Sequence, residues 1–177
     1  MEHHIKHIST THHTYLQDTS HFLRILNKVN QGPKLPKNTL LVSMDAISAY
    51  HNIPQEDGSE CLREALDERE DKEVPTEFLV SLMDLIQKCI IFEFHDGQLW
   101  KQLIGVAMGI HPAPSFANIY LARRIDSKIK ELGQKYGKDK RSALLLFKRF
   151  LDDLINLFQG TTKDLHRLFD EINQIHP

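Results

Sequence analysis

The sequence contains little that could staple a fold covalently or anchor it in a bilayer. Its 177 residues include two cysteines, Cys61 and Cys89, which are too few for a disulfide framework and form no CxxC pair. No apolar run approaches the roughly 20 residues that a membrane helix needs, and the polar N-terminus does not resemble a signal peptide. We therefore expect a protein without a membrane partner, in a reducing nuclear or cytoplasmic compartment and not secreted.

The sequence also has almost no net charge, which at first argues against a dedicated nucleic-acid binder. The formal total of −2 conceals a strong segregation, however. Residues 56–73 hold nine acids against three bases, whereas residues 101–149 hold eleven bases against three acids. The basic half could face a polyanion, or the two segments could be solvated helix faces of opposite sign.

Hydrophobic periodicity and turn residues predict a mixture of helices and strands without regular βαβ alternation, which indicates an α+β fold. We expect helices over residues 19–29, 57–70, 75–89, 114–136 and after residue 161, and strands over 39–45, 90–94, 99–103, 144–150 and 154–158. An Asp-Gly turn joins the second and third strands, and a Gly-rich loop covers residues 105–112. Cys61 and Cys89 should lie in the core, as should Phe94 and Trp100 of the hairpin.

The first 13 residues are rich in histidine and lack a clear period, so we separate them as an N-terminal tail from a single domain over residues 14–177. His3 and His7 have the i,i+4 spacing of metal ligands on a helix. No cysteine or acid completes a zinc pattern, so a flexible tail or an ordinary family segment is favoured over a metal site.

Three acidic residues stand out by their placement. Asp45 ends an apolar strand, and Asp152 and Asp153 occupy the tip of an apolar hairpin. A carboxylate buried there without a partner would be costly, whereas Mg²⁺ is commonly held by one or two carboxylates together with substrate phosphates. If the strands are neighbours, the acids converge on one point; the alternative is a pair of solvated turns, which aspartate also favours.

Three blocks of sequence carry a resemblance to a known family. They are residues 41–54 (LVSMDAISAYHNIP), 105–118 (GVAMGIHPAPSFAN) and 149–155 (RFLDDLI). In order and spacing they resemble motifs A, B and C of the palm subdomain of reverse transcriptases, most closely the retroelement type with Penelope-like or related polymerases. The resemblance extends over residues 12–177. It implies a partial reverse transcriptase domain with a palm-like antiparallel sheet and packed helices, from which fingers and thumb are largely missing.

The resemblance also implies roles for individual residues. Asp45, Asp152 and Asp153 would be the catalytic metal ligands, with the backbone carbonyl of Ala46 as a further ligand. Tyr50 would be the aromatic gate that clashes with a 2′-hydroxyl and so favours deoxynucleotides; the alternative is a core tyrosine.

The second block would complete the nucleotide-binding site. Gly109, Ala113 and Asn118 are its nucleotide-binding residues by resemblance, and the loop from Gly105 would let the backbone approach template or nucleotide closely. Val106 departs from the family, which usually has threonine there. The helix that follows carries four basic residues that could meet phosphates or form a solvated face: Arg123, Arg124, Lys128 and Lys130.

By resemblance, the activity is RNA-directed DNA polymerisation, in which Mg²⁺ (or Mn²⁺) supports nucleotidyl transfer to a primer 3′-hydroxyl. The partners would be an RNA template, a DNA primer and deoxynucleoside triphosphates, with fingers, thumb or endonuclease segments supplied elsewhere. The alternative is a truncated or domesticated relic that does not catalyse and acts as a nucleic-acid or protein-binding module.

Overall fold

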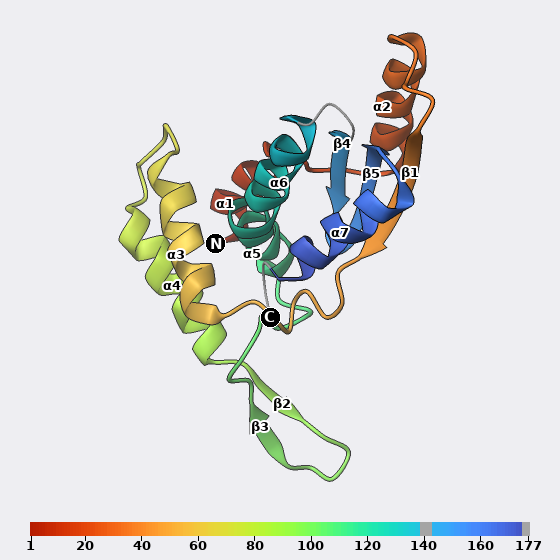
Figure 1. Cartoon of the computed structure of the whole chain (residues 1–177). Coiled ribbons are helices and arrows are strands. Elements are labelled where there is room, and N and C mark those ends of the chain that lie inside the picture. Colours follow the sequence, from red (N-terminus) through yellow and green to blue (C-terminus); the bar gives the residue numbers. More distant parts are fainter. Residues whose placement is uncertain (139–142, 175–177) are drawn as a thin grey trace. The chain divides into compact units, whose positions relative to one another are not determined.

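The computed structural model describes residues 1–138 and 143–174, and the chain forms two compact units. Unit 1 consists of residues 1–12 and 47–123, and unit 2 consists of residues 13–46 and 124–177. Both units are therefore discontinuous in the sequence. Helices are combined with antiparallel sheets (Figure 1), which confirms the predicted α+β class. No helix in the described ranges is long and apolar enough to cross a membrane.

Unit 1 is built on four helices. These are α1 (Glu2–Thr10), α3 (Gln55–Asp67), α4 (Thr76–Lys88) and α5 (Ala113–Tyr120). Helix α3 packs against both α4 and α5, and α1 packs against α5. The prediction that Cys61 lies in the core is confirmed. It is fully buried together with Leu62 and Leu66 of α3, Met83 of α4 and Phe116 of α5.

The contact between α3 and α5 depends on a glycine. A Cβ atom at Gly58 would lie 2.6 Å from Cζ of Phe116 and 3.3 Å from Cγ2 of Ile53, closer than side chains normally approach. Phe116 and Ile53 are themselves buried. Gly58 therefore sets how closely the Phe116 ring can lie against α3.

The His-rich N-terminus is not a flexible tail over its first ten residues. Helix α1 begins at Glu2, and its Ile5 is fully buried in unit 1. Ser115 of α5 also donates a hydrogen bond to Glu2 at 2.9 Å. One buried isoleucine in a polar segment is too weak a periodic signal to predict this helix, which is stabilised by tertiary packing.

The hairpin of unit 1 departs from the prediction in its packing. Strands β2 (Ile91–Glu93) and β3 (Leu99–Lys101) pair antiparallel around Gly97, which has φ = 75°. Phe94 and Trp100 stack edge to face at 6.0 Å, but both are about half exposed and are not core residues. Cys89, at the end of α4, is likewise exposed and not buried. The apolar residues here cover one another only in part, because no other described element of unit 1 packs closely over this two-stranded sheet.

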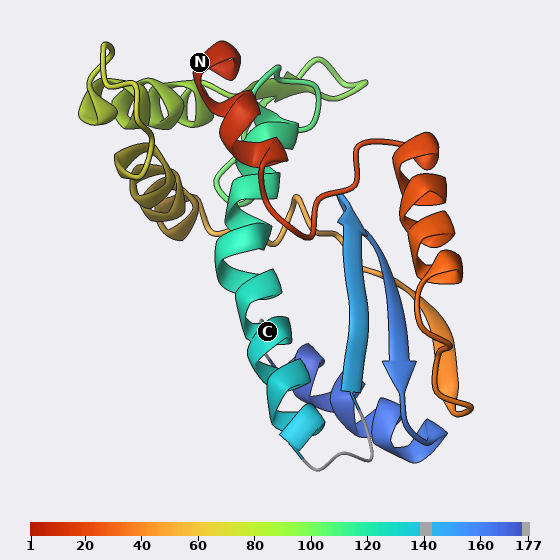
Figure 2. The same cartoon turned by 90° about the horizontal axis from the view of Figure 1, so that it is seen from above.

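Unit 2 contains a three-stranded antiparallel sheet with the order β1-β5-β4. The strands are β1 (Thr39–Asp45), β4 (Ala143–Phe150) and β5 (Asp153–Gln159). The last strand in the sequence is thus the central one, as Figure 2 shows. Its register pairs Thr39 with Gln159 and runs to Asp45 opposite Asp153. The segment around Tyr15 adds a single parallel bridge to Arg149 on the outer edge of β4.

Helices cover the sheet of unit 2. Helices α6 (Ser127–Lys138) and α7 (Thr162–Asn173) cover the face that carries Val42 and Phe158, which form the core with Leu168. Helix α2 (Thr19–Gln31) lies over the opposite face (Figure 2). The predicted start of α2 is confirmed, because Asp18 is its N-cap and accepts a hydrogen bond from the amide of His21 at 2.7 Å.

The long helix predicted from Pro114 is interrupted by a π-helical segment, η1 (Leu121–Asp126), between α5 and α6. The boundary between the two units also falls in η1, between Arg123 and Arg124. Helix α6 packs against β4, and Gly133 lies so close to Leu144 that a Cβ would meet it at 2.9 Å. Gly137 does not end this helix, which extends to Lys138.

Candidate active site

The structure brings the three predicted metal-binding aspartates to one end of the sheet in unit 2. Asp45 is the last residue of β1, and its register partner on the adjacent strand is Asp153, the first residue of β5. The amide of Ala46 donates a hydrogen bond to the carbonyl oxygen of Asp152 at 2.9 Å. The condition that the strands must be neighbours is therefore met.

The aspartates are not buried, contrary to the expectation that favoured a cation at this point. The side chains of Asp45, Asp152 and Asp153 are exposed, so no desolvation penalty calls for a metal. The cost lies elsewhere: Asp45 and Asp153 are directly opposed, and like charges in such a pair destabilise an antiparallel ladder. Within the described residues, no hydrogen bond or ion pair engages any of the three carboxylates.

The donor set fits a hard divalent cation but is not a complete metal cage. Carboxylate oxygens are the ligands that Mg²⁺ prefers, and two carboxylates with substrate phosphates and waters suffice for it. Among residues 1–138 and 143–174, no group of three or more His, Cys, Asp or Glu side chains is arranged to hold a metal ion. The site thus offers a cross-strand pair, Asp45 and Asp153, with Asp152 at the turn beside it.

The hairpin tip that carries Asp152 has an unusual backbone. Phe150 pairs with Asp153, so Leu151 and Asp152 form a two-residue turn. Leu151 has φ = 53°, a left-handed conformation that glycine adopts freely and that costs a leucine on the order of 1 kcal/mol. Such strain persists only where the surrounding structure enforces it. The turn contains no glycine or asparagine, so no residue type in the sequence indicates this conformation.

A buried network enforces this turn, and sequence reasoning missed it. Arg149 and Asp126 are almost completely buried, and the guanidinium contacts the carboxylate through Nε at 3.1 Å and Nη2 at 3.1 Å. The remaining guanidinium nitrogen of Arg149, Nη1, donates to the carbonyl oxygen of Leu151 at 3.1 Å. The hydroxyl of Thr14 donates to the same carboxylate of Asp126. The sequence does not distinguish this arginine, because Arg149 directly follows another base, Lys148, near the end of β4.

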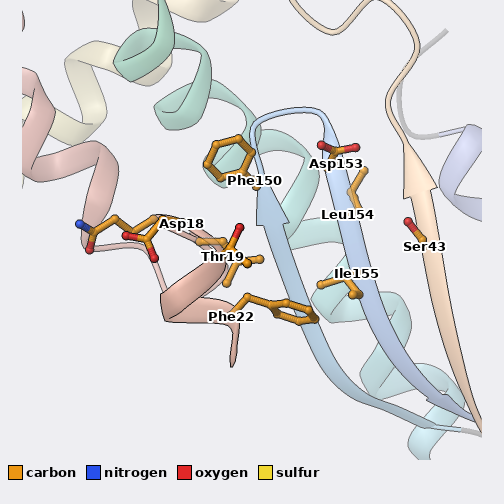
Figure 3. Close-up of a pocket in the computed structure, with 10 residues that line it drawn as sticks. Asp18, Thr19, Phe22, Ser43, Phe150, Asp153, Leu154 and Ile155 are labelled. Atoms are coloured by element: carbon orange, nitrogen blue, oxygen red, sulfur yellow. The ribbon is translucent and has the colours of Figure 1, made fainter. Parts of the chain in front are cut away.

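An apolar pocket lies beside the aspartates in unit 2. It encloses about 410 Å³ between α2 and the sheet, and Figure 3 shows Phe22, Phe150 and Ile155 lining it with Asp153 at its rim. Asp18 also contributes to the wall, but its carboxylate caps α2. The acidic side chains that line this pocket are therefore Asp18 and Asp153.

In unit 1, three of the predicted nucleotide-binding residues line a second pocket. Tyr50, Gly109 and Ala113 surround a cavity of about 430 Å³ together with His111 and neighbouring residues of the Gly-rich loop. Gly109 has φ = 94°, and the space beside its Cα is open. Asn118 is buried further along α5 and does not line this pocket.

The Gly-rich loop is fastened to the segment after β1. Gly105 has φ = 77°, and a Cβ there would lie 2.7 Å from the backbone of His51. The amide of Val106 donates to the carbonyl of Tyr50 at 2.8 Å, and Gln55 donates to the carbonyl of Gly105 at 3.1 Å. The close approach predicted at Gly105 therefore involves the chain's own backbone, and this contact positions Tyr50 at the pocket.

The basic residues after the loop do not act alike. Arg123 donates to Glu64 at 2.9 Å and to Glu68 at 2.6 and 3.0 Å, and both glutamates belong to the acidic segment of unit 1. Its hydrogen bond lowers the pKa of Glu68 below the usual glutamate range, and the two glutamates raise the pKa of Arg123. Arg123 is thus paired with acids of unit 1, whereas Lys128 and Lys130 of α6 are exposed.

Comparison with known proteins identifies the fold. No protein-family model matches the sequence, and a comparison with curated proteins finds no match. Among solved structures, apo telomerase from Candida tropicalis aligns with a TM-score of 0.67 and 15% identity, covering 96% of this chain and 32% of that one. Telomerase from Candida albicans in complex with a TWJ fragment of telomeric RNA gives a TM-score of 0.66 at 13% identity, covering 98% and 31%.

The chain spans about a third of the length of these telomerases, and at this identity the likeness concerns the fold alone. Telomerase is a reverse transcriptase. The chain therefore has a reverse-transcriptase-like fold.

Proposed function

We propose that this chain is the polymerase core of a reverse transcriptase, in which Asp45, Asp152 and Asp153 hold divalent cations. The observation that carries the proposal is the pair formed by Asp45 and Asp153, which are directly opposed, exposed and without a basic partner among the described residues. A divalent cation would turn the repulsion within this pair into attraction. The reverse-transcriptase-like fold supports the same interpretation.

The chemistry is nucleotidyl transfer to the 3′-hydroxyl of a primer. Bound Mg²⁺, or Mn²⁺ in its place, would lower the pKa of the attacking hydroxyl and neutralise charge on the leaving pyrophosphate. The chain's own contribution is to hold the carboxylates: the hydrogen bond from Ala46 to Asp152 ties the end of β1 to the hairpin tip. The carbonyl of Ala46 is proposed as a further ligand.

The pocket of unit 1 is proposed to receive the incoming deoxynucleotide. Tyr50 forms one wall, and its ring would exclude a 2′-hydroxyl, while the open backbone at Gly109 and Ala113 admits the nucleotide. Asn118 is buried within α5, outside the pocket lining, and is not proposed to contact the ligand directly.

The proposed partners are an RNA template and a DNA primer. Candida tropicalis and Candida albicans telomerases similar to this chain are described in complex with an RNA fragment. Here, the exposed Lys128 and Lys130 would contact phosphates. The motif sequences around Asp45, Gly109 and Asp152 favour a retroelement palm of Penelope-like or related type.

The decisive experiment measures metal binding and catalysis separately. Mn²⁺ is titrated into the isotopically labelled chain, and we expect paramagnetic broadening of the amides of residues 45–46 and 152–153 before any others. Asp45→Asn and Asp153→Asn should each weaken Mn²⁺ binding by about tenfold or more, because one carboxylate of the pair is lost. Asp170→Asn, which changes an exposed aspartate of α7 in the same unit, is the matched control. Uniform broadening, or equal effects of all three substitutions, would contradict the proposal.

Catalysis is read from primer extension on an RNA template with Mg²⁺ or Mn²⁺. Extension that is abolished by Asp45→Asn and retained by Asp170→Asn supports the proposed enzyme. Extension that survives Asp45→Asn would show that the activity is not this chain's.

A second candidate function is nucleic-acid binding without catalysis. It is favoured by the incomplete metal cage, since no group of three ligands is preformed in the described part of the chain. Salt-dependent binding to a primer–template, with no extension and no site-specific Mn²⁺ broadening, would support this candidate against the first.

A further inference from the structure

We infer that Arg149 is a positioning residue that holds the hairpin tip in the shape that presents Asp152. The inference rests on the proposed function, because that function gives the position of Asp152 its importance. The hydrogen bonds on which it is based do not depend on that function. The inference assigns a role in the site to Arg149 and its partner Asp126, neither of which is among the proposed metal or nucleotide ligands.

The guanidinium of Arg149 uses all three of its nitrogens. Two of them, Nε and Nη2, bind the carboxylate of Asp126, and the third, Nη1, binds the carbonyl of Leu151. The side chains of Arg149 and Asp126 are 3% and 0% exposed. Only a planar guanidinium can grip a carboxylate on one side and a carbonyl on another at the same time.

The network is attached to well-held backbone at both of its ends. The backbone of Arg149 is clamped by the segment beside it, since its amide donates to Thr14 and its carbonyl accepts from Leu16, both at 2.8 Å. Asp126 is held by its position at the end of η1, which continues directly into α6. The guanidinium is therefore held in place by the backbone of Arg149 and by Asp126. Its hydrogen bond to the carbonyl of Leu151 restrains the turn.

The hairpin tip requires such support because its backbone is strained. Leu151 adopts φ = 53° at an energetic cost, and the next residue is Asp152. If the turn relaxed to negative φ, the carbonyl of Asp152 would leave the amide of Ala46, and the carboxylates would separate from Asp45. A buried ion pair is by itself weak evidence for stability, whereas a third hydrogen bond aimed at the strained residue indicates a positioning role.

The test uses Arg149→Lys, because lysine keeps the charge opposite Asp126 but cannot reach Leu151 at the same time. Loss of a supporting residue of this kind typically weakens metal binding about 10- to 100-fold, and we expect a fall of that size in Mn²⁺ affinity. Thr14→Val is the matched control: it removes a hydrogen bond to the same carboxylate without touching Leu151, and affinity should stay within about twofold.

A rescue variant separates positioning from a merely structural role. Leu151→Gly adopts positive φ without cost, so adding it to Arg149→Lys should restore most of the lost Mn²⁺ affinity. A purely structural loss in the buried network would not be repaired by a substitution at the surface turn. Absence of rescue would overturn the inference.

A measurement on the metal-free chain tests this inference separately from the proposed function. Hydrogen exchange at the amide of Ala46 reports whether the tip remains closed on β1, because that amide binds the carbonyl of Asp152. We expect Arg149→Lys to accelerate this exchange by about tenfold and Thr14→Val to leave it unchanged. Unchanged exchange in Arg149→Lys overturns the inference even if the metal site is real, whereas faster exchange supports it even if no metal binds.

Should Arg149→Lys fail to fold, the unaltered chain supplies the test. The guanidinium protons of Arg149 should exchange slowly with water and show cross-peaks to Leu151, because all three nitrogens are bound and buried. Rapid exchange of these protons would overturn the inference.

Discussion

At the scale of single residues, much of this molecule depends on positions where a side chain is absent or strained. Gly58 and Gly105 allow close backbone or ring contacts, and Leu151 tolerates a left-handed φ for which the sequence offers no glycine. From the sequence alone, Gly58 and Gly105 are recognisable only as residues without a side chain, and the contacts that require them are not. Their partners, Phe116 and His51, are far away along the chain, so the contacts follow from tertiary packing alone.

Replacing Gly58 with alanine should destabilise the helical core of unit 1. The added methyl would overlap the buried ring of Phe116, and overpacking of this kind costs about 1–3 kcal/mol. Chemical denaturation measures the loss. The control is Gly32→Ala, whose Cβ would lie 3.3 Å from the carbonyl oxygen of Lys28 and 3.4 Å from that of Val29, close to ordinary contact. Gly97→Ala is unsuitable as a control because Gly97 has a positive φ. Equal stability of Gly58→Ala and the parent would show that the ring moves freely.

At the scale of elements, the sequence predicts most helices and strands but not their exposure. The strand over residues 39–45 and the hairpin around Asp152 have alternating or continuous apolar runs, and they are confirmed. The exposed face of Trp100 and the buried Ile5 are not visible in the pattern, since both depend on whether another element packs against them. Of the candidate site, the resemblance named the aspartates and Tyr50 but not the Arg149 network, because burial of an arginine has no local signal.

The start of α7 should make a measurable contribution to stability. Thr161 and Asp164 form a capping box, in which each side chain binds the backbone amide of the other. Thr161→Ala should lower the free energy of unfolding by about 1 kcal/mol. Thr162→Ala, at the adjacent position inside the helix, is the matched control, and a similar loss there would argue against the cap.

The same cap should depend on pH. Its hydrogen bonds to Thr161 lower the pKa of Asp164 below its ordinary value of 3.8. The carboxylate therefore stabilises the folded state above the unfolded pKa, and this contribution disappears as pH falls through the lower, folded pKa. The difference in melting temperature between the parent and Asp164→Asn should be constant near neutral pH and vanish in acid. A difference that persists in strong acid would contradict the titration.

At the scale of the whole molecule, the basic residues of the segregated charge fall into two sets. Part of the basic stretch neutralises the acidic stretch within unit 1, as Arg123 does with Glu64 and Glu68. The remainder, including Lys128 and Lys130, is exposed in unit 2. The near-zero total therefore neither excludes nor indicates a polyanionic partner.

Substitutions should separate these two sets of bases. Lys128→Gln and Lys130→Gln should each weaken binding to a primer–template and lower the slope of its salt dependence by about one, because one phosphate fewer is neutralised. Arg123→Gln should leave the binding unchanged, because that guanidinium is already paired, and should lower stability by about 1 kcal/mol or less. Filter binding at several salt concentrations measures the affinities, and chemical denaturation measures the stability. A larger fall in affinity in Arg123→Gln would show that its ion pairs open for the nucleic acid.

The position of β5 at the centre of the sheet determines when the sheet of unit 2 can form during synthesis of the chain. A ribosome delivers β1 more than a hundred residues before β5, its hydrogen-bonding partner. Among the strands that the structure describes, β1 pairs only with β5, because β4 lies on the other side of β5. The aspartate pair thus comes into existence only after Asp153 has been synthesised, and pairing over so long a separation folds slowly. During that interval the nascent chain presents an unprotected strand, the kind of surface on which aggregation begins and to which chaperones bind.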